Sequence, residues 1–205
     1  FADRYWYFLK CLRDRGVYVM LDIFTATGMF TEAVKNEDSS YGRFQIFFNE
    51  CYRNHWKAGF DYLLKTPNPY TGKALVDDPQ LIAITCYNEQ EHLLNIGGSK
   101  LEMFTPDWRK FRNPANPASV PEFSRKLIQS AGPEGDAARE YLRKRFHEMN
   151  AFYLGVVKDS GFRGFVTNWD MFMRNLEGDA RADFNAVAMH TYHAHPNKVK
   201  LYPPT

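Results

Sequence analysis

The stretch LIAITCYNEQE, residues 81–91, decides the fold expected for this chain. Residues 81–87 form a continuous run of apolar and β-forming side chains, which is typical of a strand buried on both faces of a sheet. The polar pair Asn88 and Glu89 follows this run directly. Barrel enzymes build their sites at the carboxyl ends of such strands, so the pair predicts a functional site there.

Further strands and helices are expected on either side of this stretch. Apolar runs predict strands at residues 17–24, 165–167 and 186–190. Helical spacing of apolar side chains predicts helices at residues 5–14, 49–64 and 136–158, the second with Asn49 as its N-cap. Buried strands that alternate with helices predict a parallel sheet with helices outside it.

The expected fold class is α/β, of the (β/α)8 TIM barrel type. Four predicted strands are half of a closed barrel, so we expect the central (βα)4 portion of one. The expected organisation is a single catalytic-barrel segment over residues 1–205 with a long inserted loop at about residues 92–135. We expect sequence outside this chain, or another chain, to supply the remainder, because proteins avoid open sheet edges.

Composition excludes several classes of function. The net charge of +2 sets up no long-range field for nucleic acid or an anionic membrane, so neither is an expected partner. No apolar run approaches the length of a membrane span. No glycine-rich phosphate-binding motif is present, and the cysteines at positions 11, 51 and 86 form no CxxC pair, so no cofactor is expected.

Four segments together resemble one family of enzymes. Residues 82–89, IAITCYNE, resemble the fourth-strand signature of clan A glycoside hydrolases, the group that includes family 5 cellulases and mannanases. Residues 68–79 resemble the segment before that strand, residues 16–22 the third strand and residues 190–196 the sixth. The segments follow one another in the order of the family and span nearly the whole chain.

The resemblance implies a role for each candidate residue. Glu89 would be the general acid/base, and Asn88 would bind the 2-hydroxyl of the sugar at the cleavage point. His190 and Tyr192 would line the same subsite, and Trp169 would stack on a sugar ring. Retaining enzymes need a second carboxylate as nucleophile. The family carries it after the seventh strand, and no residue of this sequence matches it, so we expect it outside this chain.

Other residues carry competing interpretations. Asp22, at a strand end, is expected to face the substrate or to fix a loop. Glu91 is the rival of Glu89 but is expected to be solvated. His190, His193 and His195 form HxxHxH, yet alternate side chains of a strand point to opposite faces, so no metal site is expected.

Three further features of the sequence have structural or peripheral interpretations. Asp77-Asp78 before Pro79 is expected to be a turn. The basic run of Arg139, Arg143, Lys144 and Arg145 is expected to be the solvated side of a helix. Trp108 is considered as a sugar platform within the long loop.

The expected function is retaining hydrolysis of a β-linked glycan, with an oligo- or polysaccharide as partner. The alternative is a catalytically inactive carbohydrate-binding barrel or half-barrel, which is favoured by Phe24 at a position where the family often has histidine. The sequence leaves the glycan and the choice of endo or exo action open. Secretion is expected from the substrate class alone.

Overall fold

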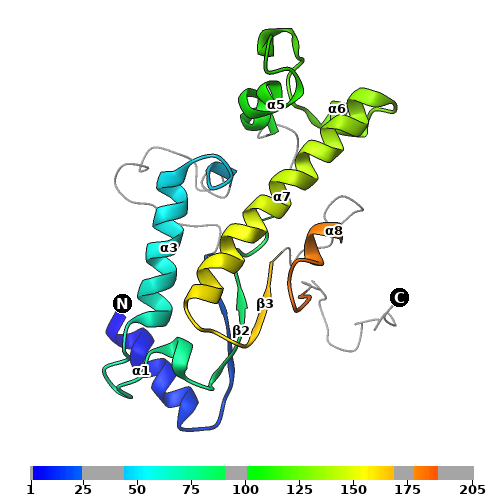
Figure 1. The fold of residues 1–205 in the computed structure, drawn as a ribbon. Helices are drawn as coiled ribbons and strands as arrows, with labels where there is room; N and C mark the ends of the chain where they lie inside the picture. The colour runs from blue at the N-terminus through cyan, green and yellow to red at the C-terminus, as the bar shows by residue number, and fades with distance from the viewer. Residues whose placement is uncertain (1, 25–43, 91–100, 169–177, 189–205) are drawn as a thin grey trace, which may run out of the picture.

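The computed structural model describes residues 2–24, 44–90, 101–168 and 178–188 (Figure 1). In chain order the elements are α1 (Ala2–Arg13), β1 (Val19–Asp22), α3 (Glu50–Lys65), η2 (Leu75–Asp77), β2 (Leu81–Thr85), η3 (Leu101–Phe104), α5 (Thr105–Arg112), η4 (Pro117–Ser119), α6 (Arg125–Gln129), α7 (Pro133–Asp159), β3 (Phe165–Thr167) and α8 (Gly178–Arg181).

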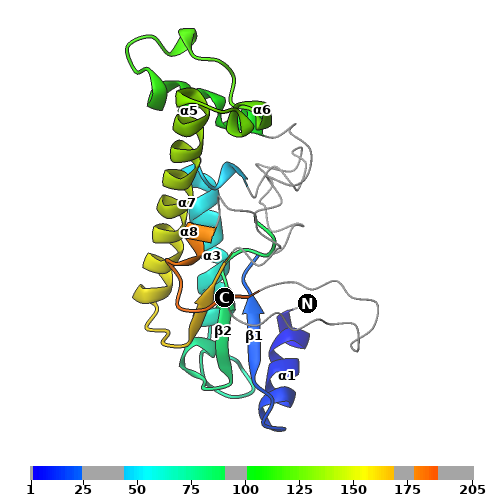
Figure 2. The same cartoon turned by 90° about the vertical axis from the view of Figure 1, so that its right-hand side faces the viewer.

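The described strands form one parallel sheet of order β1-β2-β3. The strand predicted at 165–167 is β3, and the strand predicted at 81–87 is β2, which ends at Thr85. The predicted helices correspond to α1, α3 and α7, and Asn49 caps α3 by accepting from the N–H of Cys51. Crossovers between parallel strands are right-handed, and the strands follow one another in sequence order, so both crossover helices are placed on one face. Figures 1 and 2 show α3 and α7 on the same side of the sheet.

Burial along the sheet follows this one-sided arrangement. Ile84 and Val166, which are register partners, are buried at 0% and 6% exposure beneath the helices. The neighbouring row contains Met20, Ala83 and Phe165, and its two outer members are 49% and 59% exposed. Figure 2 looks onto this second face, which no described helix covers.

The expected barrel is wrong. The described residues form an open sheet of three parallel strands, which is too small to close into a barrel. The predicted strand at 186–190 accounts for part of the error, because residues 186–188 adopt no strand conformation and residues 189–190 lie outside the described part. The α/β class and the parallel direction of the strands were predicted correctly, whereas neither the barrel nor its (βα)4 portion was.

Residues 185–188 lie beside β3 without joining its ladder. The side chain of Asn185 accepts a hydrogen bond from the N–H of Val166 at 2.7 Å and donates one to the carbonyl of Gly164 at 3.2 Å. The N–H of Ala188 donates to Oγ1 of Thr167 at 3.3 Å. The Asn185 side chain therefore bonds backbone groups along this edge of β3 that would otherwise pair with the backbone of a fourth strand.

The segment predicted as a long loop contains short helices where the structure describes it. Residues 101–129 include η3, α5, η4 and α6. Trp108 of α5 is fully buried and contacts the rings of Phe123 and Tyr141 at centroid distances of 5.6 and 5.4 Å. The proposed role of Trp108 as a sugar platform is therefore wrong, since its indole ring lies inside the helical layer.

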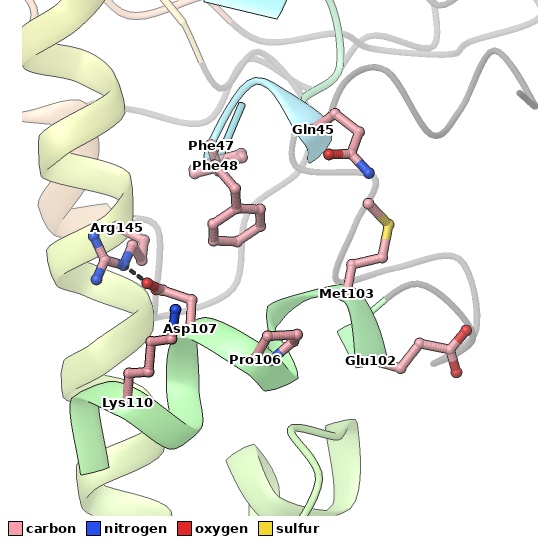
Figure 3. A pocket seen from close by; sticks show the side chains of 9 residues that line it. All are labelled: Gln45, Phe47, Phe48, Glu102, Met103, Pro106, Asp107, Lys110 and Arg145. Atoms are coloured by element: carbon pink, nitrogen blue, oxygen red, sulfur yellow. Dashed lines mark ion pairs between the residues drawn. The ribbon is translucent and has the colours of Figure 1, made fainter. Parts of the chain in front are cut away.

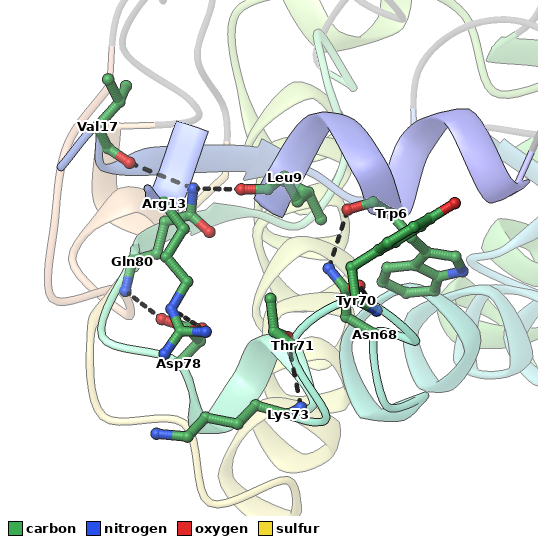
Figure 4. A network of polar contacts seen from close by, with 10 residues as sticks. All are labelled: Trp6, Leu9, Arg13, Val17, Asn68, Tyr70, Thr71, Lys73, Asp78 and Gln80. Atoms are coloured by element: carbon green, nitrogen blue, oxygen red, sulfur yellow. Dashed lines mark hydrogen bonds and ion pairs between the residues drawn. The ribbon is translucent and has the colours of Figure 1, made fainter. Parts of the chain in front are cut away.

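A polar network joins α1 to the turn before β2 (Figure 4). The amide of Asn68 donates to the carbonyl of Trp6 at 3.0 Å, and the amide of Gln80 donates to the carbonyls of Leu9 and Val17 at 3.0 and 3.2 Å. Buried Asp78 pairs with Arg13 at 3.1 Å and accepts from the N–H of Gln80. These contacts agree with the turn predicted at this position.

Candidate active site at the carboxyl edge of the sheet

Three segments meet where the strands end, and we call this place the carboxyl edge (residues 22–24, 85–90 and 167–168). The N–H of Asn88 donates to the carbonyl of Phe24 at 2.8 Å, which ties the segment after β2 to the segment after β1. On the other side, the N–H of Tyr87 donates to Oδ1 of Asn168 at 3.0 Å. The predicted residues Asp22, Asn88 and Glu89 therefore share one edge.

Glu89 has an unusual backbone conformation. Its φ is 51°, and it is the one non-glycine residue with positive φ in the described part of the chain. For a residue with a Cβ this region costs about 1 kcal/mol or more. Such conformations concentrate at active sites, where the surrounding structure holds them. The carboxyl side chain of Glu89 is half-buried at this turn.

A buried polar network holds the turn from both sides of Glu89. Oε1 of Gln90 accepts hydrogen bonds from the amide of Asn168 at 2.9 Å and from the hydroxyl of Tyr153 at 3.2 Å. Gln90, Asn168 and Tyr153 are each at most 1% exposed. Burial raises the pKa of Tyr153 well above its ordinary value, so the hydroxyl keeps its proton and continues to donate. The network fixes the residue directly after Glu89 to β3 and α7.

Asp22 lies in a row with two threonines at the same edge. Its register partner is Thr85, whose own partner on the other side is Thr167. Thr85 is fully buried, and its Oγ1 has no hydrogen-bond partner among the described residues. Asp22 is half-buried, and it ends β1 at the same edge of the sheet as the turn that carries Glu89.

Neither Cys86 nor Phe24 contributes reactive chemistry to this edge. Burial raises the pKa of the Cys86 thiol far above neutral pH, so it does not supply a thiolate. Phe24, where the resembled family often has histidine, is 2% exposed and stacks on Trp56 and Tyr87 at centroid distances of 6.3 and 5.8 Å. This position supplies a core side chain and no polar group.

Several predicted site residues lie outside the described residues. They are Trp169, His190 and Tyr192, together with Glu91, His193 and His195. Within the described ranges no group of three His, Cys, Asp or Glu side chains is placed to hold a metal ion.

The sequence did not reveal Gln90, Asn168 and Tyr153 as partners. Tyr153 follows the helical spacing of the apolar side chains of α7, which gives no sign that its hydroxyl reaches Gln90. Asn168 had a detectable signal, because it is a polar residue directly after a buried strand, as Asn88 is. Their contacts join residues 63 and 78 positions apart in the sequence, which only the fold brings together.

Comparison with known proteins adds no further assignment. No family model, curated protein or solved structure matches the chain. Among the described helices, none combines the length and the apolar character that crossing a membrane requires. The candidate site therefore rests on its own geometry: a strained glutamate at the carboxyl end of the central strand, with Asn88 and Asp22 beside it and a buried network behind it.

Proposed function

We propose that the chain takes part in retaining hydrolysis of a β-linked glycan, with Glu89 as general acid/base. The observation that carries this proposal is the left-handed conformation of Glu89 at the end of the middle strand of a parallel sheet. Ligands of parallel α/β sheets bind outside the carboxyl ends of the strands. A half-buried carboxyl group held there is placed to exchange a proton with a bound substrate.

The reaction divides into two balanced steps. In the first, protonated Glu89 gives its proton to the glycosidic oxygen while the bond from C1 to that oxygen breaks, and a second carboxylate attacks C1 to form an ester. In the second, the Glu89 carboxylate takes a proton from water, and the water oxygen displaces the carboxylate from C1. The side-chain amide of Asn88 would hold the 2-hydroxyl of the same sugar.

The decisive variant is Glu89→Gln, with Glu91→Gln as the matched control two residues away. With alkyl or sugar leaving groups, which need protonation, loss of a general acid typically reduces the rate about 10²- to 10⁴-fold. With dinitrophenyl glycosides the first step should persist, and azide should restore turnover as glycosyl azide, because azide attacks without losing a proton. Equal loss with both leaving groups, or equal effects of both variants, would refute the role of Glu89.

A 2-deoxy-2-fluoro glycoside identifies the second carboxylate. Trapping adds one sugar mass to the protein, and peptide mapping of the trapped protein assigns the ester to one residue. Asp22 is the neighbouring carboxylate on the described sheet, and Asp22→Asn should weaken substrate binding without abolishing the label. A label on Asp22 itself would instead make it the nucleophile.

The second candidate function is carbohydrate binding without catalysis. The burial of Phe24 in the aromatic core favours it, because this position then offers the substrate no hydrogen-bonding group. Under this alternative an oligosaccharide binds the wild-type protein and Glu89→Gln equally well, and neither protein turns it over. Isothermal titration calorimetry with both proteins, followed by chromatography of the sugar, distinguishes the two functions.

A further inference from the structure

A hollow separate from the carboxyl edge lies among η3, α5, α7 and the turn before α3 (Figure 3). Its volume is about 710 Å³, which is within the range of pockets that bind small molecules. We call it the α5 pocket and define it by Gln45, Phe48, Met103, Asp107, Lys110 and Arg145. These residues come from segments far apart in the sequence, so the fold creates the pocket.

Aromatic rings form a fixed apolar wall of the pocket. Phe47 is 3% exposed and contacts the rings of Phe104 and Phe146 at centroid distances of 5.6 and 6.1 Å. The ring of half-buried Phe48 meets that of Phe104 edge to face, with centroids 4.7 Å apart. Because these contacts hold the phenylalanines, the wall offers an apolar surface without an ordering cost on binding.

A preformed ion pair provides the polar wall. Asp107 Oδ2 accepts from the hydroxyl of Tyr141 and pairs with Nε of Arg145, each at 2.7 Å. The guanidinium of Arg145 also pairs with Glu148 and lies 5.4 Å from the ring centroid of Tyr141. Arg145 was predicted to lie on the solvated side of its helix, but only 20% of its side chain is exposed. A guanidinium has five donors, so it can bond a ligand while keeping these partners.

The charges of the pocket favour a neutral ligand. Lys110 and Arg145 are balanced by Glu102 and Asp107, so a phosphate or a polyamine would meet as many like charges as opposite ones. A sugar ring matches the lining better, because it has an apolar face of C–H groups and a rim of hydroxyls. The apolar face suits Phe48, while the hydroxyls suit carboxylate, guanidinium and amide groups.

The α5 pocket lies at the same end of the molecule as Glu89. Arg145 precedes Tyr153 by eight residues on α7, and the hydroxyl of Tyr153 binds Gln90 beside Glu89. At the helical rise per residue this separation is about 12 Å along the helix axis. A glycan of a few sugar units is long enough to cover this separation.

We propose that the α5 pocket is a remote subsite that binds a sugar unit of a neutral oligosaccharide, at a distance from the bond that is cleaved. This inference rests on the proposed function, since it takes Glu89 as the point of cleavage. It assigns the pocket to recognition of chain length: long substrates use it and short ones do not reach it.

The test compares substrates of different length. Cello- and manno-oligosaccharides, from disaccharide to hexasaccharide, and an aryl monoglycoside are supplied to the wild-type protein, the double variant Gln45→Ala/Lys110→Ala and Phe48→Leu. Gln45 and Lys110 are not buried, so the double variant should fold normally, and Lys126→Ala, at an exposed position of α6, is the matched control. We expect kcat/KM for the hexasaccharide to fall about tenfold in the pocket variants, and that for the aryl glycoside to change less than about twofold.

Direct binding separates this inference from the proposed function. Titration of cellohexaose and mannohexaose into Glu89→Gln protein, with and without the pocket substitutions, measures recognition without turnover. Unchanged binding and unchanged length dependence in the pocket variants would overturn the subsite while leaving the role of Glu89 intact. Binding that the pocket substitutions weaken, in a protein whose wild type cleaves no glycoside, would keep the binding site and overturn the hydrolase.

Discussion

The carboxyl edge and the α5 pocket use polar side chains in opposite ways. At the edge, Gln90 and Asn168 are buried, and each is bonded to defined partners on other elements. At the pocket, Lys110 is exposed, and Asp107 and Arg145 keep 33% and 20% of their side chains accessible. Buried polar groups stabilise one geometry and are costly to disturb, whereas accessible ones stabilise little and are available to a ligand.

The largest contrast is expected in thiol chemistry. Cys86 at the carboxyl edge is fully buried and its pKa is raised by burial, while Cys51 on α3 is exposed. In native protein, Cys86 should react with Ellman's reagent on the order of 10³-fold more slowly than Cys51, because labelling requires the sheet to open. The double variant Cys11→Ser/Cys51→Ser leaves Cys86 as the one thiol of the sequence, and fast labelling of that variant would show that the carboxyl edge opens readily.

The stability contrast can be measured with two glutamines. Gln90→Ala leaves the Tyr153 hydroxyl and the Asn168 amide without a buried acceptor, so unfolding free energy should fall by about 2–4 kcal/mol. The side chain of Gln45 at the α5 pocket makes no hydrogen bond to another described residue, so Gln45→Ala should change the unfolding free energy by less than about 0.5 kcal/mol. Urea unfolding of both variants measures these two changes in unfolding free energy. Similar losses would mean that polar side chains stabilise the two regions equally.

These two regions also show how far sequence reasoning reaches. The strands at 81–85 and 165–167 were predictable because continuous apolar runs are a local property. Closure of a barrel is not local: no single strand encodes how many neighbours it has, so four apolar runs were overinterpreted. Val187, within the expected fourth strand, is 69% exposed, which shows that an apolar run does not ensure burial.

Inside the α5 region the sequence carried signals that were missed. Leu101, Phe104, Trp108 and Phe111 recur at intervals of three and four residues, which predicts one face of helical turns and a buried Trp108. Arg145 follows Tyr141 by four residues, so the two share a helix face and their contact was predictable. Gln90 had no such signal, because its partners are brought to it only by the fold.

Loss of the ion pair between Arg145 and Asp107 should lower the unfolding free energy by an amount between the effects of Gln90→Ala and Gln45→Ala. Arg145→Met keeps much of the aliphatic volume, but among the described residues it leaves Asp107 with the Tyr141 hydroxyl as its one remaining side-chain partner. We expect a loss of about 1 kcal/mol, discounted because both side chains are partly accessible. The loss should shrink at high salt in thermal melts, since accessible ion pairs are screened. A loss of stability as large as that of Gln90→Ala would mean that this ion pair stabilises the fold as strongly as the buried polar groups do.

The smallest contrast concerns pH. His55 on α3 contacts the ring of Phe24 at a centroid distance of 6.1 Å, and burial lowers its pKa below the ordinary 6.5. A lowered pKa means that the unfolded chain binds the proton more readily. The contribution of His55 is therefore present above pH 6.5 and is lost as the pH falls through its lower folded value. His55→Gln should flatten the fall in stability between pH 7.5 and about pH 5; an unchanged slope would assign the fall to other groups.

The side chain of Asn185 has a consequence for self-association. An exposed strand edge is a template on which a strand from another molecule can add, and repeated addition is the route to fibrils. Along β3 the Asn185 amide already occupies the N–H of Val166 and the carbonyl of Gly164, so an incoming chain must first displace it. Asn185, which lies outside any helix or strand, thus hinders the addition of a strand from another molecule at this edge.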